Sequence, residues 1–145
     1  RGNVRWDELS FFEAAKKSLP VETEYHALRM LYEECKQMGC SFAWGTGKVD
    51  GSFSVKFPGV SKNTIISVYS QGNLQFAFEA FKKTPKQVEF RDELKQKLEN
   101  QMKLIFKDDY QKRYPLFTKD YWITQVPDLL NVIREMKETY TKIID

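Results

Sequence analysis

The stretch "SFSVKFPGVSKNTIISVYSQGNLQFAF", residues 52–78, decides the fold, because apolar and polar side chains alternate along it between short turn signals. Successive side chains of a strand point to opposite faces, so Phe53, Val55 and Phe57 are predicted to share one face. Gly72 and Asn73 favour a tight turn. With residues 40–44, the pattern predicts four strands in an antiparallel meander, at 40–44, 52–57, 64–69 and 74–78.

Helical periodicity surrounds this stretch on both sides. Residues 6–17 predict a short helix with Leu9 and Phe12 on one side, and residues 21–39 predict a second helix capped by Gly39. Residues 84–106 predict a third, N-capped by Thr84, and residues 127–144 predict the last. The apolar stripe predicted for the third helix consists of Val88, Leu94, Leu98, Met102 and Ile105. Residues 107–124 are aromatic-rich but aperiodic and predict an irregular connection.

The order of helices, four strands and helices predicts an α+β domain. We expect a four-stranded antiparallel meander, with the N-terminal and C-terminal helices packed on one of its faces. The opposite face is predicted to carry small polar residues, which suits either solvent or a docking platform; these are Ser52, Ser54, Lys56, Ser67 and Gln75.

Length and composition favour one domain spanning residues 1–145. The sequence begins with Arg1 and not Met, from which we expect a piece of a longer protein. It contains no apolar run of about 18 residues and no apolar signal-peptide core, so a cytoplasmic location without membrane contact is expected. The net charge is +3, and residues 82–119 hold eleven basic and six acidic side chains, which makes this segment a candidate for nucleic-acid contact.

The glycine-rich stretch at residues 42–57 invites comparison with a phosphate-binding loop. A P-loop runs from a strand into a helix and places Ser or Thr after its lysine, whereas Lys48 is followed by Val49 and another predicted strand. Gly45 and Gly47, together with Gly51, are instead expected to shape a hairpin whose backbone takes positive φ.

The residues offer little for catalysis. His26 is the one histidine, and Cys35 and Cys40 suit neither a zinc set nor a disulfide framework, so no metal ion or cofactor is predicted. Asp108 and Asp109 lack the spacing of a calcium loop. One enzymatic alternative stays open, a small magnesium-dependent nuclease; its candidates are Asp50 in a turn, and Glu79 and Lys82 near the end of the fourth strand.

Two binding hypotheses remain beside it. Lys82, Lys83 and Lys86 are the candidates for contacts with nucleic-acid phosphates. A small-ligand or protein-binding sensor domain would instead need a cavity beneath Trp44, Tyr69 and Trp122, which come from the aromatic-rich meander and the segment after it.

The segments "WGTG", "GSFSVKFPG" and "TIISVYSQGNLQFAF", within residues 42–78, resemble an uncharacterised bacterial accessory domain with a W-G-x-G-x-x-x-G-S-F hairpin. Members of that group are sometimes attached to restriction-endonuclease-like nuclease domains. The resemblance implies no catalytic residue. It implies a non-catalytic interaction module of a prokaryotic protein, covalently attached to a catalytic domain and aiding its engagement of nucleic acid, and we favour this role over an enzymatic one.

Overall fold

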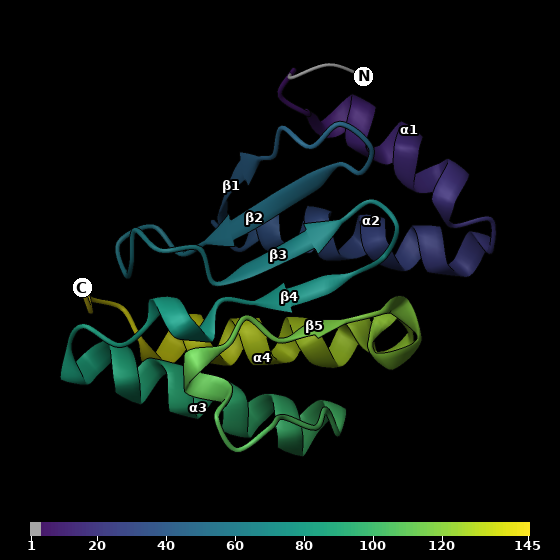
Figure 1. Ribbon diagram of the computed structural model, residues 1–145. Helices are drawn as coiled ribbons and strands as arrows, with labels where there is room; N and C mark the ends of the chain where they lie inside the picture. Colours follow the sequence, from purple (N-terminus) through teal and green to yellow (C-terminus); the bar gives the residue numbers. More distant parts are fainter. Residues whose placement is uncertain (1–3) are drawn as a thin grey trace.

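The computed structural model describes residues 4–145, which form an α+β fold around an antiparallel sheet (Figure 1). The strands follow one another in chain order across the sheet, so the predicted meander topology is confirmed. Their bounds are β1 Ser41–Trp44, β2 Ser52–Lys56, β3 Ile66–Tyr69, β4 Leu74–Phe76 and β5 Leu116–Phe117.

The sheet has five strands, so the prediction of four is wrong. The additional strand β5 pairs with β4, with Leu116 opposite Gln75 and Phe117 opposite Leu74. It lies within residues 107–124, where the sequence predicted an irregular connection. Two residues are too few to display the alternation by which strands are recognised, so β5 left no periodic signal.

Two helices precede the sheet, α1 Glu8–Ser18 and α2 Glu22–Gln37. Asp7 caps α1 by accepting a hydrogen bond from the Ser10 backbone N–H at 2.8 Å. Gly39 ends α2 at φ +86°, as its cap position predicted. The predicted apolar side of α1 is wrong for Leu9, which is 72% exposed, because Phe11, Phe12 and Ala15 take the buried side.

Two helices follow the sheet, α3 Pro85–Met102 and α4 Val126–Thr139. Thr84 caps α3 as predicted, because its hydroxyl accepts the Gln87 backbone N–H at 3.0 Å. The predicted stripe of α3 is confirmed at Leu94, Leu98 and Met102, which are buried. It is wrong at Ile105, which lies beyond the helix and is 87% exposed, and at Val88, which is only half-buried, and it omitted Phe90, which is buried. The chain leaves helical geometry at Lys103, whose φ is +58°, so the 100° spacing no longer applies at Ile105.

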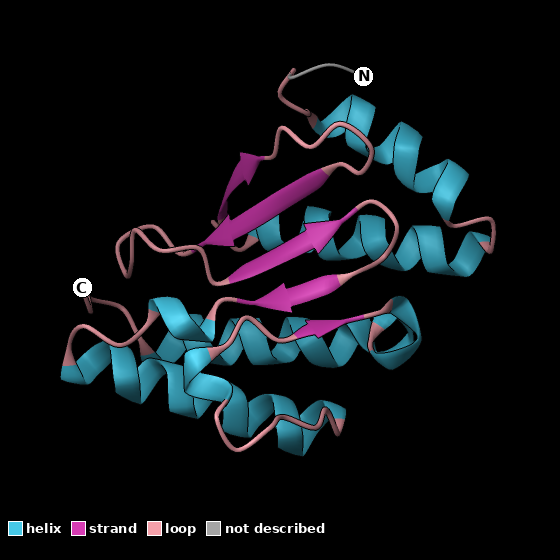
Figure 2. Ribbon diagram, viewed as in Figure 1, coloured by secondary structure: helices cyan, strands magenta, loops and turns pink. Residues whose placement is uncertain are grey.

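The two faces of the sheet differ as the alternation predicted. The apolar face carries Phe53, Val55, Ile66, Val68, Leu74 and Phe76, all buried. Helices α2 and α4 pass behind the strands and pack against each other, and α3 packs on α4 (Figure 2). Trp122 is completely buried in this core, and its indole N–H donates to the Gly72 carbonyl at 2.9 Å.

Helical segments lie on both sides of the sheet, so the prediction that they pack on one face only is corrected. The short 3-10 helix η1 (Phe78–Ala80) reaches the polar side, where Ala80 lines a hollow together with Ser54 and Ser67. Its three residues form less than one turn of an α-helix, too few for a helical period to show. Among residues 4–145, no helix is long and apolar enough to span a membrane.

Candidate nucleic-acid interface

The polar side of the sheet, here called the open face, consists of half-buried side chains of β2, β3 and β4, namely Ser52, Ser54, Lys56, Ser67, Tyr69 and Gln75. The hydroxyl oxygens of Ser54 and Ser67 lie 3.3 Å apart across the β2–β3 pair. Tyr69 donates its hydroxyl to Gln75 Oε1 at 3.1 Å. These contacts order the side chains of a surface that faces the viewer in Figure 2.

Three hollows adjoin the open face and the β5 edge of the sheet. The sheet hollow, about 260 Å³, is lined by Ser54, Asn63, Thr64, Ser67, Gln75, Ala77, Ala80 and Tyr114. The hairpin hollow, about 580 Å³, is lined by Gly47, Lys48, Val49, Asp50, Ser52, Tyr69, Gln71, Asn73 and Leu116. The basic hollow, about 510 Å³, is lined by Ile105, Phe106, Lys107, Tyr110, Lys112, Arg113, Tyr114, Pro115, Leu116 and Phe117.

Neighbouring hollows share lining residues, and the two shared residues lie at or near β5. Leu116 lines both the hairpin hollow and the basic hollow. Tyr114 lines both the basic hollow and the sheet hollow. The two side chains are 48% and 47% exposed, respectively. An extended ligand lying across Tyr114 and Leu116 would therefore contact all three hollows.

The basic hollow combines three cationic side chains with an aromatic wall and has no acidic residue in its lining. Lys107 and Lys112 have no carboxylate within 4.0 Å among residues 4–145, whereas Arg113 is paired with Asp109 at 2.6 Å. The Arg113 guanidinium, and to a smaller extent the charge of Lys107, hold the pKa of Asp109 below its usual value. The ring of Phe106 packs on Phe117, with centroids 5.4 Å apart. The hollow therefore presents unpaired positive charge beside apolar ring surface.

A hydrogen-bonded network supports the wall of the basic hollow. Tyr110 donates its hydroxyl to Asp92 at 2.5 Å, and the Arg91 Nε donates to the same carboxylate oxygen at 2.9 Å. The Lys95 ammonium lies 4.7 Å from the centroid of the Tyr110 ring. Burial raises the pKa of Tyr110, and its bond to Asp92 raises it further. Burial also raises the pKa of Asp92, but hydrogen bonds from Arg91 and Tyr110 outweigh it and hold that pKa below its usual value.

Tyr114 is held in place at both ends. Its hydroxyl donates to Glu79 Oε2 at 3.0 Å, and its backbone carbonyl accepts a hydrogen bond from Gln75 Nε2 at 3.2 Å. The other oxygen of Glu79 accepts a hydrogen bond from the Lys82 ammonium. The Lys82 ammonium, and secondly the Tyr114 hydroxyl, hold the pKa of Glu79 below its usual value.

The three lysines predicted to contact phosphates do not form one cluster of free charges. Lys82 is paired with Glu79, and Lys86 with Glu89 at 3.1 Å. Lys86 lines a different hollow, between the start of α3 and the end of the chain after α4. Lys83 is exposed and has no carboxylate within 4.0 Å among residues 4–145. Within the basic segment 82–119, the cations that share one concave surface are instead those of the basic hollow.

Close approach explains the hairpin glycines Gly47 and Gly51, and the prediction that the hairpin glycines take positive φ is wrong. Among the described glycines, positive φ occurs at Gly39, Gly59 and Gly72. A Cβ on Gly51 would lie 2.9 Å from the Trp6 ring, whereas one on Gly45 would meet the Ser52 hydroxyl, the end of a side chain that can rotate away. At Gly47 the obstacle is backbone, because a Cβ would lie 2.9 Å from the Asp50 carbonyl oxygen.

The three aromatic residues proposed to cover a sensor cavity lie in different places. Trp44 packs against Phe11 and Phe53, Tyr69 lines the hairpin hollow, and Trp122 is buried in the core. Trp44 and Tyr69 belong to opposite faces of the sheet, because Trp44 pairs with Phe53 of the apolar face and Tyr69 with Ser52 of the open face. The described residues therefore do not bring the three rings around a shared cavity.

The candidates for metal-dependent catalysis are also separated. Asp50 lines the hairpin hollow and accepts a hydrogen bond from Gln71 at 3.3 Å, whereas Glu79 pairs with Lys82 beside the sheet hollow. Among residues 4–145, no three His, Cys, Asp or Glu side chains are grouped as metal ligands would be. The nuclease alternative therefore has no assembled site in the described residues.

The histidine and the two cysteines lie outside the three hollows. His26 lies on the surface of α2, with its Nε2 3.3 Å from a Glu22 carboxylate oxygen. Cys35 and Cys40 are free, buried thiols at the junction of α2 and β1. The Cys40 backbone N–H donates to the Cys35 carbonyl at 3.0 Å, which closes the turn after α2 and brings the two side chains together.

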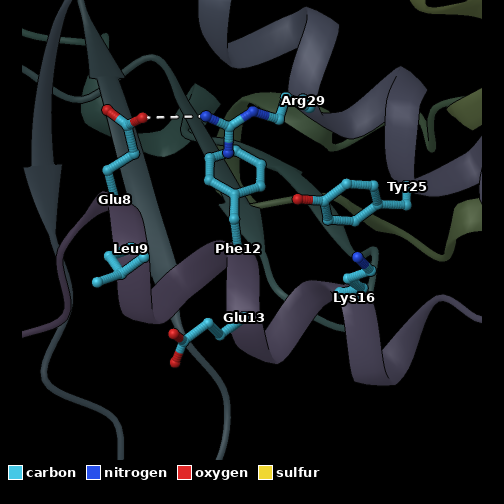
Figure 3. Close-up of a pocket in the computed structure, with 7 residues that line it drawn as sticks. All are labelled: Glu8, Leu9, Phe12, Glu13, Lys16, Tyr25 and Arg29. Carbon is cyan, nitrogen blue, oxygen red and sulfur yellow. Dashed lines mark hydrogen bonds and ion pairs between the residues drawn. The ribbon is translucent and has the colours of Figure 1, made fainter.

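A further hollow, of about 310 Å³, lies between α1 and α2 (Figure 3). The Arg29 guanidinium lies over the Phe12 ring at 4.5 Å from its centroid and pairs with Glu8 at 3.2 Å. Glu8 also accepts the Tyr32 hydroxyl at 3.1 Å. Two further charged side chains line this hollow, Glu13 and Lys16, and neither has a partner of opposite charge within 4.0 Å among residues 4–145. The lining thus holds two acidic and two basic side chains and lacks the excess of positive charge found in the basic hollow.

Comparison of the chain with protein-family models, with curated proteins and with solved structures finds no match. The functional interpretation therefore depends on the geometry of the described residues, and the resemblance to bacterial accessory domains stays a prediction.

Proposed function

We propose that this protein is a non-catalytic interaction domain of a prokaryotic, cytoplasmic protein, and that it helps an attached nuclease domain to engage nucleic acid. The observation that carries the proposal is the basic hollow, where Lys107, Lys112 and Arg113 surround an aromatic wall without an acidic neighbour in the lining. Cationic side chains beside exposed rings are the combination that nucleic-acid-binding grooves use.

The distribution of paired and unpaired charge supports this location over the rest of the basic segment. On α3, Lys86, Lys95 and Lys97 form ion pairs with Glu89, Glu99 and Glu135. Such pairs must be broken or shared before a lysine can bind a phosphate, whereas Lys107 and Lys112 have no carboxylate within 4.0 Å among residues 4–145. We therefore assign phosphate contact to the basic hollow and a lesser role to Lys82 and Lys86, which are paired, and to Lys83, which is unpaired but lines none of the three hollows.

The proposal is tested by removing the two unpaired charges of the hollow. In the double variant Lys107→Gln/Lys112→Gln, we expect weaker binding of labelled DNA and a shallower dependence of affinity on salt. For single-stranded DNA the plot of log K against log salt has a negative slope, and each lost phosphate contact reduces the magnitude of that slope by about 0.7. Losing two contacts should therefore reduce it by about 1.4.

A matched control separates local contact from net charge. Lys16 and Lys17 lie on α1, away from the basic hollow, and have no carboxylate within 4.0 Å among residues 4–145. The double variant Lys16→Gln/Lys17→Gln makes the same change in net charge and should leave the slope within about 0.3 of the unaltered protein. Equal losses in both double variants would contradict the assignment, and so would an unaltered protein that retains no DNA at low salt.

A further inference from the structure

We infer that the ligand of the basic hollow is a single-stranded nucleic acid, one base of which stacks on the ring of Tyr114. This inference rests on the proposed function and adds the class of nucleic acid and the residue that distinguishes it. It follows from the way the Tyr114 ring is fixed, from its position between hollows, and from the small number of unpaired cations nearby.

The Tyr114 ring is both exposed and fixed. It is 47% exposed, yet its hydroxyl donates to Glu79 at 3.0 Å, which restrains the ring. The backbone carbonyl of Tyr114 accepts the Gln75 amide at 3.2 Å, which holds the main chain at this residue. An exposed ring usually loses rotational freedom when a ligand stacks on it, and fixing the ring beforehand reduces that loss. Unpaired bases expose faces that stack on such rings, whereas a duplex covers both faces of each base pair except at its ends.

The position of Tyr114 suits an extended strand. The ring borders the sheet hollow on one side and the basic hollow on the other, and Leu116, two residues on, borders the hairpin hollow. Tyr114 lies two residues before β5, and an extended chain separates residues two apart by at most about 7 Å. A single strand crossing the β5 edge would thus place one base at Tyr114 and continue past Leu116 along the open face.

The charges near Tyr114 fit few phosphates. Lys107 and Lys112 are unpaired among residues 4–145, and Arg113 is already bonded to Asp109. Duplex binding relies on many phosphate contacts and on an element that enters a groove, but the charged face of α3 is largely neutralised by its own ion pairs. The surface therefore favours a short single strand, where stacking supplies affinity that the phosphates do not.

The test compares a fluorescein-labelled oligo-dT of about 12 nucleotides, within the range of sites on single-strand-binding domains, with a duplex of equal length. Affinities are measured by fluorescence anisotropy at low salt with the full chain. We expect the single strand to bind more tightly than the duplex. Tyr114→Ala should weaken single-strand binding by about 5- to 150-fold, the equivalent of losing one stacked base.

Two further variants separate stacking from structural effects. Tyr114→Phe keeps the ring but loses the hydroxyl bond to Glu79 that restrains it, so its affinity should fall between those of the unaltered protein and Tyr114→Ala. Tyr121→Ala removes a ring that is 63% exposed and lines none of the three hollows, although it packs on Phe117 of the basic hollow with centroids 6.3 Å apart. This variant should keep most of the affinity, in contrast to Tyr114→Ala. Circular dichroism checks that each variant is folded.

The outcomes distinguish this inference from the proposed function. Equal affinity for duplex and single strand, with no loss in Tyr114→Ala, would overturn the single-strand inference while the proposed nucleic-acid function stands. Absence of binding to either DNA would overturn both.

Discussion

Gly51 offers the sharpest test of the packing around the hairpin. Its backbone is fixed on both sides, because its N–H donates to the Ser70 hydroxyl at 2.9 Å and its carbonyl accepts the Ser70 N–H at 2.9 Å. In Gly51→Ala, the new Cβ would lie 2.9 Å from Trp6 Cε3 and 3.1 Å from Phe11 Cδ2. Since ordinary contact begins at 3.4 Å, a buried ring must move by about 0.5 Å.

Overpacking of this kind costs about 1–3 kcal/mol of unfolding free energy. For 145 residues the unfolding entropy is about 0.3 kcal/mol/K, so a cost of about 2 kcal/mol lowers the Tm by about 7 °C. Thermal unfolding monitored by circular dichroism measures the shift, and urea unfolding measures the free energy. A Tm within about 1 °C of the unaltered protein would refute the reasoning.

A second variant tests whether Trp6 is the cause. Trp6→Leu destabilises the protein by itself, but it also removes the ring that opposes the new methyl group. The double variant Gly51→Ala/Trp6→Leu should therefore lose less stability than the sum of the two single variants, by about 0.5 kcal/mol or more. Simple additivity would show that the methyl group introduced at position 51 is accommodated elsewhere.

Three other predictions concern stability. Trp122→Ala should cost about 3–5 kcal/mol in urea unfolding, because it empties a completely buried site and frees the Gly72 carbonyl. Asp92→Asn should be less stable than the unaltered protein at neutral pH. Because the pKa of Asp92 is depressed in the fold, the difference in unfolding free energy between the two proteins should shrink as pH falls below about 4. Urea unfolding at several pH values measures this difference. Burial and the bond to Glu8 raise the pKa of Tyr32 from 10.0 to about 12. The stability that Tyr32 contributes is therefore present below pH 10 and is lost as the pH rises toward 12. In Tyr32→Phe, the free energy of unfolding should fall less steeply between pH 10 and pH 12 than in the unaltered protein.

The elements predicted correctly from the sequence are those with a periodic side-chain pattern or a recognisable helix cap. Alternation from residue 52 to 76 identified β2, β3 and β4 and separated the apolar face from Ser54 and Ser67, because side chains of a strand alternate whatever packs upon them. The caps at Gly39 and Thr84 were also predicted correctly, since each satisfies groups that any helix end exposes.

The candidate site was largely beyond such prediction. The basic hollow is built from residues 105–117, an aperiodic segment whose shape depends on β5 pairing with β4 and on Phe106 packing against Phe76 and Phe78. The sequence indicated a basic segment, but ion pairing in three dimensions determines which of its lysines stay available. The one useful local signal was the clustering of aromatic and basic residues from Tyr110 to Tyr114.

The central claim is tested most directly by mapping DNA contacts on the protein itself. Backbone amide chemical shifts of isotopically labelled protein are recorded while unlabelled oligo-dT is added. The account predicts that the largest changes fall on residues 105–117, with smaller changes on the open face at Ser67 and Gln75. Changes confined to the hollow between α1 and α2, or none at any residue at low salt, would contradict it.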